Sequence, residues 1–140
     1  MKKSLLIAVD FDGTIVEDAF PKVGKKKPFA IETIRMLQDD GHRIILWTYR
    51  HGKALQEAIE FLQKSGIKLY AVNKSYPEEE NNPKGVSRKI NADLFIDDRN
   101  IGGFLGWDKV WQLIHPDGGD LDLKVFEPEA HYPQKKGFFN

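Results

Sequence analysis

The sequence predicts an α/β domain in which helices cover both faces of a central parallel sheet. Apolar segments of strand length alternate along the chain with segments whose apolar residues recur at helical spacing. The first of these segments, Leu5–Val9, is an unbroken apolar run, which is typical of a strand buried on both faces. With 140 residues, of which 41% are hydrophobic, the chain fits one domain, residues 1–140, around one core.

The first half of the chain contains three predicted strands and two predicted helices. After the first strand, a polar and basic stretch leads to Pro28, which suits the first turn of a helix that ends before Gly41. The apolar residues of this helix fall on one face: Ile31, Ile34 and Leu37. The further elements expected are a strand over Arg43–Trp47, a helix over Lys53–Lys64 and a strand over Ile67–Val72.

The second half is less regular. Lys74–Gly85 is polar and is interpreted as a solvated loop or the start of a frayed helix. A fourth strand is expected over Asp93–Ile96, whereas Trp107–Ile114 fits either a short helix or a last strand. Residues 116–140 form a C-terminal extension, in which the alternation of Leu121, Leu123 and Val125 indicates an edge strand before a tail.

Composition excludes several classes of function. Lys and Arg total 21, as do Asp and Glu, so no net field draws the chain to nucleic acid or to a membrane. Because cysteine is absent, disulfides, thiolate catalysis and thiolate metal sites are excluded. The apolar run near Met1 is too short for a signal peptide, and no segment reaches the ~18 apolar residues of a membrane span. We therefore expect a cytoplasmic protein.

Two carboxylates follow the first predicted strand in the pentapeptide Asp10–Thr14. If the extended backbone continues past Val9, Asp10 and Asp12 project to the same side, at the strand end where parallel sheets bind ligands. Gly13 then allows a sharp turn. Adjacent carboxylates repel unless a cation or a shared proton relieves them, and oxygen ligands suit Mg²⁺. The alternative is a simple turn, because Asp, Gly and Thr are common turn residues.

The pentapeptide resembles the first motif of the haloacid dehalogenase (HAD) superfamily. The other motifs of the superfamily are matched in order by Thr48 after an apolar strand, by Lys89, and by the acidic pair Asp97 and Asp98. The resemblance spans about residues 4–114 and is most similar to a small group of short hydrolases of bacteria and phages. It implies a three-layer Rossmann-like fold, without a cap domain because both intervals that carry caps in the superfamily are short here.

The resemblance implies a Mg²⁺-dependent phosphohydrolase that acts on phosphomonoesters through an aspartyl-phosphate intermediate. Asp10 would be the nucleophile and Asp12 the general acid and base. Thr48 would donate its hydroxyl to a phosphate oxygen, and Lys89 would offset the phosphate charge. The expected metal ligands are Asp10, Asp97 and the backbone carbonyl of Asp12, while Asp98 would not touch the metal but would orient a metal-bound water or Lys89.

Further residues are expected around the substrate. The resemblance implies phosphate contacts from the turn and from the end of the second strand, at Phe11, Gly13, Thr14 and Tyr49. Arg50 would grip a second anionic group in two-point fashion, unless it is an exposed loop residue. Lys84 and Arg88 lie close enough in sequence to replace Lys89.

The same residues leave other interpretations open. Thr48 fits an ordinary strand end, and Asp97 and Asp98 fit the cap of a following helix. A phosphotransferase would use the same site. A non-catalytic phosphate-binding or regulatory domain fits less well, because receiver domains carry their acceptor Asp after strand three, where this chain has Asn73.

The substrate is expected to carry phosphate, but the sequence does not name it. A small phosphorylated molecule would need a neighbouring subunit to cover the site, as in a homo-oligomer, whereas an open site suits a bulkier phosphorylated substrate. The tryptophans Trp47, Trp107 and Trp111 lie in apolar segments and are expected in the core.

Overall fold

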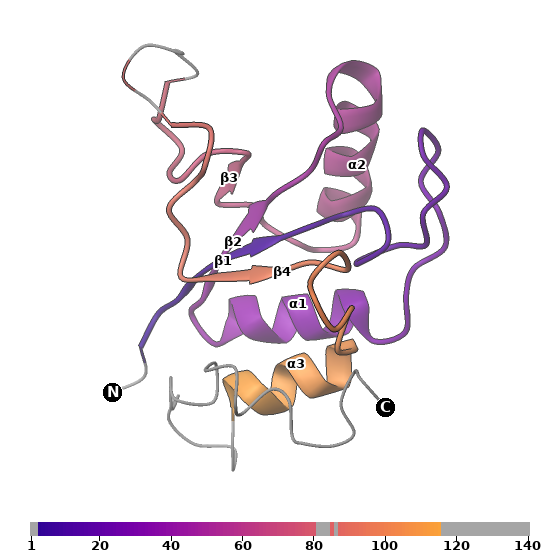
Figure 1. Ribbon diagram of the computed structural model, residues 1–140, viewed down its shortest axis with the longest axis vertical. Helices are drawn as coiled ribbons and strands as arrows, with labels where there is room; N and C mark the ends of the chain where they lie inside the picture. Colours follow the sequence, from indigo (N-terminus) through magenta and orange to yellow (C-terminus); the bar gives the residue numbers. More distant parts are fainter. Residues whose placement is uncertain (1–2, 81–84, 86, 116–140) are drawn as a thin grey trace.

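A four-stranded parallel sheet organises the molecule. The computed structural model describes residues 3–80, 85 and 87–115. In spatial order the strands are β3 (Ala71–Val72), β2 (Arg43–Leu46), β1 (Leu6–Val9) and β4 (Leu94–Ile96) (Figure 1). The predicted α/β class with a central parallel sheet is confirmed.

Three helices accompany the sheet: α1 (Ala30–Asp39), α2 (Gly52–Lys64) and α3 (Trp107–Ile114). The segment for which the sequence left helix or strand open is thus a helix, and it lies beside α1 (Figure 1). β3 is shorter than the predicted strand over Ile67–Val72. The reason is local, because the N–H of Ile67 donates to Leu62 at the end of α2 instead of pairing with β2.

The core divides between the two faces of the sheet. Alternate residues of β1 and β2, among them Ile7, Val9 and Ile44, pack with apolar residues of α1, α2 and α3. The opposite face, with Ala8 and Ile45, is covered by Ile90 from the segment before β4.

The layering therefore differs from the prediction that helices cover both faces. In the described part of the chain, all three helices bury their apolar residues on one face. The described part of the connection between β3 and β4 is polar, and it forms turns and bends in place of a helix. It lacks the apolar periodicity that a covering helix needs.

The register of the strands sets the position of the site. Val9 pairs with Leu46 of β2 and with Ile96 of β4, so three strands end level. The ladder continues one residue further, because Asp10 N–H donates to Ile96 and Trp47 N–H to Val9, each at 2.9 Å. The residues that follow these strands consequently meet at one edge of the sheet.

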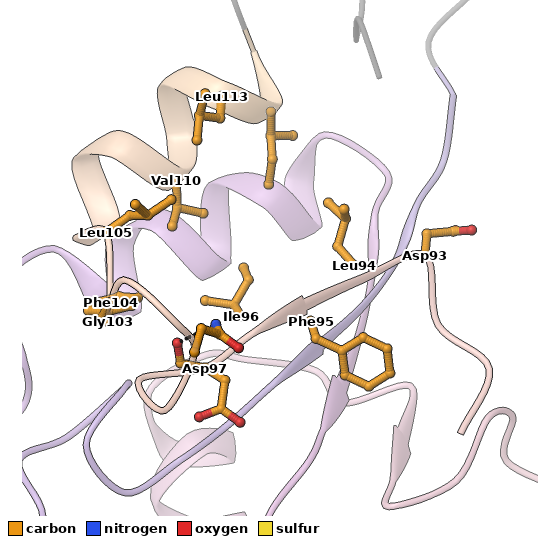
Figure 2. Close-up of a pocket in the computed structure, with 12 residues that line it drawn as sticks. Asp93, Leu94, Phe95, Ile96, Asp97, Gly103, Phe104, Leu105, Val110 and Leu113 are labelled. Carbon is orange, nitrogen blue, oxygen red and sulfur yellow. Dashed lines mark hydrogen bonds between the residues drawn. The ribbon is translucent and has the colours of Figure 1, made fainter. Parts of the chain in front are cut away.

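An apolar cavity of about 220 Å³ lies between β4 and α3 (Figure 2). Leu94 and Ile96 line it from the strand, and Val110 and Leu113 from the helix. Asp97 stands at its end and also lines the larger cavity at the sheet edge. Figure 2 shows its carboxylate pointing away from the apolar side chains.

Some predictions fall elsewhere in the chain. The predicted edge strand around Leu121–Val125, the tail and Lys84 lie outside the described residues. Across the described segments, the helices are too short and too polar to cross a lipid bilayer.

Candidate active site

Three carboxylates gather at the carboxyl edge of the sheet. Asp10 follows β1, and Asp97 and Asp98 follow β4. One oxygen from each lies within 4.8 Å of the others, and all three side chains are half-buried. They line a cavity of about 560 Å³, which also contains Thr48. Two segments far apart in the sequence therefore build one acidic cluster.

The three carboxylates of the cluster repel one another when all are ionised and no cation is bound. Burial raises the pKa of Asp10 from its ordinary value of 3.8 to about 7, and the charges of Asp97 and Asp98 add to this rise. A hydrogen bond from Thr14 acts in the opposite direction. A group of hard oxygen donors with excess negative charge fits a divalent cation such as Mg²⁺. Asp10, Asp97 and Asp98 are the residues that would hold it.

Gly13 makes the cluster sterically feasible. Its φ is +88°, and a Cβ at this position would lie 2.2 Å from Oδ2 of Asp98. Only glycine therefore lets Asp98 approach the turn after β1. The N–H of Gly13 donates to the carbonyl of Val16 at 2.7 Å, so it is not directed at a phosphate as predicted.

Phe11 and Thr14 are also turned into the protein. Phe11 is fully buried and makes an edge contact with Phe61 of α2. Thr14 is fully buried too, and its hydroxyl donates to Oδ2 of Asp10 at 2.9 Å. Its carbonyl accepts the indole N–H of Trp107 at 2.8 Å. Thr14 therefore positions Asp10 and connects it to α3, where the sequence suggested a phosphate contact.

Arg50 is paired with Asp12 inside the protein. Nε–H and one Nη2–H donate to the two oxygens of Asp12, each at 2.7 Å. The remaining donors bind main-chain carbonyls, those of Pro21, Lys22 and Ala54. The guanidinium is only 1% exposed and lies near the rings of Phe11 and Phe20, at 5.0 and 5.3 Å. All five N–H donors of Arg50 are thus used.

This pairing differs from the prediction made for Arg50. Arg50 has no donor left for a substrate anion in this arrangement. The carboxylate of Asp12 accepts from Arg50 and stands apart from the three clustered carboxylates, although Asp12 lines the same cavity. Nothing in the local pattern could reveal the pair, because its members are 38 residues apart.

Hydrogen bonds fix the position of Thr48, and its hydroxyl proton remains available to a ligand. Its N–H donates to Oδ1 of Asn73 at 2.8 Å, and its Oγ1 accepts the N–H of Arg50 at 3.1 Å. Because Oγ1 acts as an acceptor here, the hydroxyl can still donate to a ligand in the cavity. Sequence reasoning gave Asn73 no such positioning role, although its place at a strand end is a weak indication.

Comparisons with known proteins place the chain in a family. No family model and no curated protein matches it. A solved structure, that of a conserved protein coded by a locus of Bacteroides thetaiotaomicron, is 52% identical, with a TM-score of 0.75. The match covers 80% of this chain and 90% of that chain. The chain belongs to the same family as this Bacteroides protein. Family membership fixes the fold, so the chemistry must be argued from the cavity.

Among the described residues, the cationic one that lines the cavity is Arg99, which sequence reasoning passed over. Its N–H donates to Oδ1 of Asp97 at 3.0 Å, and its side chain is exposed. Lys89 is also exposed, but it is not among the described residues that line the cavity. Its neighbour Ile90 packs on the second face of the sheet. The structure therefore does not bring Lys89 to the carboxylates.

Aromatic side chains form another part of the cavity lining. Phe20, Trp47 and Tyr49 all contribute to it. Tyr49 is 93% exposed, whereas Trp47 is half-buried beside Phe95. Of the tryptophans predicted in the core, Trp107 is fully enclosed, while Trp47 reaches the site.

Proposed function

We propose that this protein is a Mg²⁺-dependent phosphohydrolase that cleaves phosphate monoesters through an aspartyl-phosphate at Asp10. The observation that carries this proposal is the convergence of Asp10, Asp97 and Asp98 within 4.8 Å at the carboxyl edge of a parallel sheet. Such an edge is where open α/β sheets bind ligands. The order of motifs along the sequence supports the same chemistry.

The clustered carboxylates would hold the cation. When bound, Mg²⁺ offsets the negative charge of Asp10 and of the substrate phosphate, so that the two can approach. Asp10 is then ionised at neutral pH despite its raised pKa. The hydrogen bond from Thr14 to Oδ2 fixes the carboxylate orientation and leaves Oδ1 to act as the nucleophile.

The reaction proceeds in two displacements. An oxygen of Asp10 attacks phosphorus while the bond from phosphorus to the leaving oxygen breaks, and the leaving oxygen takes up a proton from the carboxyl of Asp12. Water then gives a proton back to Asp12 and attacks the phosphorus of the aspartyl-phosphate, the bond to Asp10 breaks, and inorganic phosphate is released. The hydroxyl of Thr48 donates to a phosphate oxygen and stabilises its negative charge.

Asp12 is the acid and base in this proposal, and Arg50 controls its position. Both oxygens of Asp12 accept one N–H group of Arg50 each, so each keeps a second lone pair through which it can take up and deliver a proton. The two hydrogen bonds keep the carboxylate at the cavity wall during transfer. Arg50 is therefore a positioning residue.

The decisive assay measures phosphate release from sugar phosphates, nucleotides and other phosphorylated metabolites with Mg²⁺. Asp10→Asn retains an oxygen that can accept the Thr14 hydroxyl, so it removes the nucleophile and one negative charge of the acidic cluster but preserves this hydrogen bond. We expect it to lose roughly 10⁴-fold or more in turnover. Asp39→Asn is the matched control, because Asp39 is exposed at the end of α1. Equal phosphate release by wild type and Asp10→Asn would reject the proposal.

The same assay shows which basic side chain, Arg99 or Lys89, offsets the charge of the substrate phosphate. We expect Arg99→Ala to lower turnover more than Lys89→Ala, because Arg99 lines the cavity. The reverse order would assign the offset of phosphate charge to Lys89, as the resemblance to HAD enzymes implies.

A further inference from the structure

One wall of the cavity is formed by two aromatic residues that are exposed and do not pack in the core. Phe20 comes from the loop between β1 and α1, and Tyr49 from the turn after β2. They are 52% and 93% exposed, respectively. Exposed rings of this size beside a proposed catalytic centre present stacking surfaces to a ligand.

Tyr49 is held in its exposed position by its neighbours. The N–H of Thr48 is bound by Asn73, and Arg50 is anchored through all its guanidinium donors. The backbone on both sides of Tyr49 is thus fixed, and this residue lines the cavity while it stays exposed to solvent. A ligand that stacks on it has little backbone freedom to restrict, which lowers the entropic cost of binding.

Phe20 is supported from within. Its ring lies 5.3 Å from the buried guanidinium carbon of Arg50, and its N–H donates to Asp18. Arg50 therefore connects the aromatic wall to Asp12 and to the carboxylate end of the cavity.

The residues that line the cavity differ in burial. Asp10 is half-buried and accepts a hydrogen bond from the fully buried Thr14, whereas Tyr49 is almost entirely exposed. A ligand with its phosphate at Asp10 and a ring at Tyr49 needs a spacer that joins the two groups. A volume of about 560 Å³ falls within the range of pockets that enclose small-molecule ligands.

We propose that the substrate is a nucleoside monophosphate, with its phosphate at Asp10 and Thr48 and its base stacked on Tyr49 and Phe20. The sugar is the spacer. This inference rests on the proposed phosphohydrolase function, and it names the substrate class of the same site. Arg99, which lines the same cavity, adds a positive charge that complements the phosphate.

The test compares two substrates that differ only in the base, adenosine 5′-monophosphate and ribose 5-phosphate. We expect the wild type to have the higher kcat/KM for the nucleotide. In Tyr49→Ala, the ratio of the two kcat/KM values should fall roughly 5- to 150-fold, the range that base–aromatic stacking supplies. Tyr49→Trp should restore the ratio, because it restores a stacking ring.

Tyr76→Ala is the matched control. Tyr76 is 47% exposed, and it does not line the cavity. We expect its substrate ratio to equal that of the wild type. A 5′-phosphorylated oligonucleotide, measured beside the free nucleotide, shows whether the base is recognised on a free nucleotide or at a strand end. A Tyr49-dependent preference for the free nucleotide supports the inference, and a preference for the oligonucleotide overturns it.

Binding separates the failure of this inference from the failure of the proposed function. Calorimetry with Asp10→Asn and Mg²⁺ measures the affinity for adenosine 5′-monophosphate without turnover. If no substrate is hydrolysed but Tyr49-dependent nucleotide binding remains, the catalytic proposal fails and the ligand class stands. If ribose 5-phosphate is hydrolysed as well as the nucleotide, or if a phosphotyrosine peptide is preferred to both, the nucleotide inference is overturned.

Discussion

The two carboxylates of the turn after β1 are balanced by different partners. Asp10 accepts the hydroxyl of Thr14 and joins Asp97 and Asp98, whereas Asp12 binds Arg50 through both oxygens. Sequence reasoning considered a cation or a shared proton as relief for the pair. A buried arginine is a third solution, and it explains how two acidic residues so close in sequence coexist.

Removing Arg50 should destabilise the protein strongly. Arg50→Ala would leave the largely buried carboxylate of Asp12 without its cation and release three main-chain carbonyls. We expect the free energy of unfolding to fall by about 3 kcal/mol or more. Arg50→Lys should restore only part of this, because lysine lacks the planar fork. Urea unfolding measures both variants, and full recovery with lysine would contradict a bidentate role.

Gly13→Ala should disrupt the acidic cluster specifically. The added Cβ would lie 2.2 Å from Oδ2 of Asp98, so Asp98 must move. Gly41→Ala is the matched control, because Gly41 also has positive φ but open space around it. Both variants should lose about 1 to 2 kcal/mol of stability from backbone strain. Only Gly13→Ala should also lose Mg²⁺ affinity in calorimetry, and equal affinities would contradict the role of Asp98.

The raised pKa of Asp10 predicts an unusual pH dependence of stability. Between pH 3.8 and about 7 the native protein holds a proton on Asp10 that the unfolded chain has released. The free energy of unfolding of the cation-free protein should therefore fall as pH rises through this window. Mg²⁺ should counteract the fall, because it stabilises the ionised form. Urea unfolding with a chelator across this range measures the slope, which should be smaller in Asp10→Asn.

At the scale of elements, α3 supports the site from behind. Trp107, its first residue, is 2% exposed and donates its indole N–H to the carbonyl of Thr14. Thr14 in turn holds Asp10. One hydrogen bond therefore links the packing of a helix to the orientation of the proposed nucleophile.

Trp107→Phe tests this link. The variant keeps an aromatic ring in the core but leaves the buried Thr14 carbonyl without its donor, which should cost about 1 to 3 kcal/mol. We also expect weaker Mg²⁺ binding, because the turn that carries Asp10 is less restrained. Trp111→Phe is the control, since Trp111 is half-buried and stacks on His115. If both variants bind Mg²⁺ like the wild type, α3 has no part in the site.

Element prediction from sequence succeeded where the apolar pattern was long enough. α1 and α2 follow the periodicity of their apolar residues, and β1 follows the run that includes Ile7. The segment of α3 was too short for its pattern to separate helix from strand. β3 was predicted too long because the sequence does not show that Ile67 closes the end of α2.

At the scale of the whole molecule, the sheet brings distant acidic residues together. The order β3-β2-β1-β4 places the ends of β1 and β4 side by side, so Asp10 and Asp97 were foreseeable neighbours once a parallel sheet was assumed. The Asp12–Arg50 pair, the close approach of Asp98 to Gly13 and the exposure of Tyr49 depend on side-chain packing. Local sequence patterns carry no information on such contacts.

The proposed function depends on one divalent cation held by Asp10, Asp97 and Asp98. Calorimetric titration of Mg²⁺ into the wild type and into Asp97→Asn tests it most directly. The asparagine keeps the Oδ1 acceptor for the Arg99 N–H, so the variant removes charge while it preserves the local turn. We predict that Asp97→Asn weakens Mg²⁺ binding at least about 10-fold, and that Asp39→Asn binds like the wild type. Unchanged affinity in Asp97→Asn would contradict the claim.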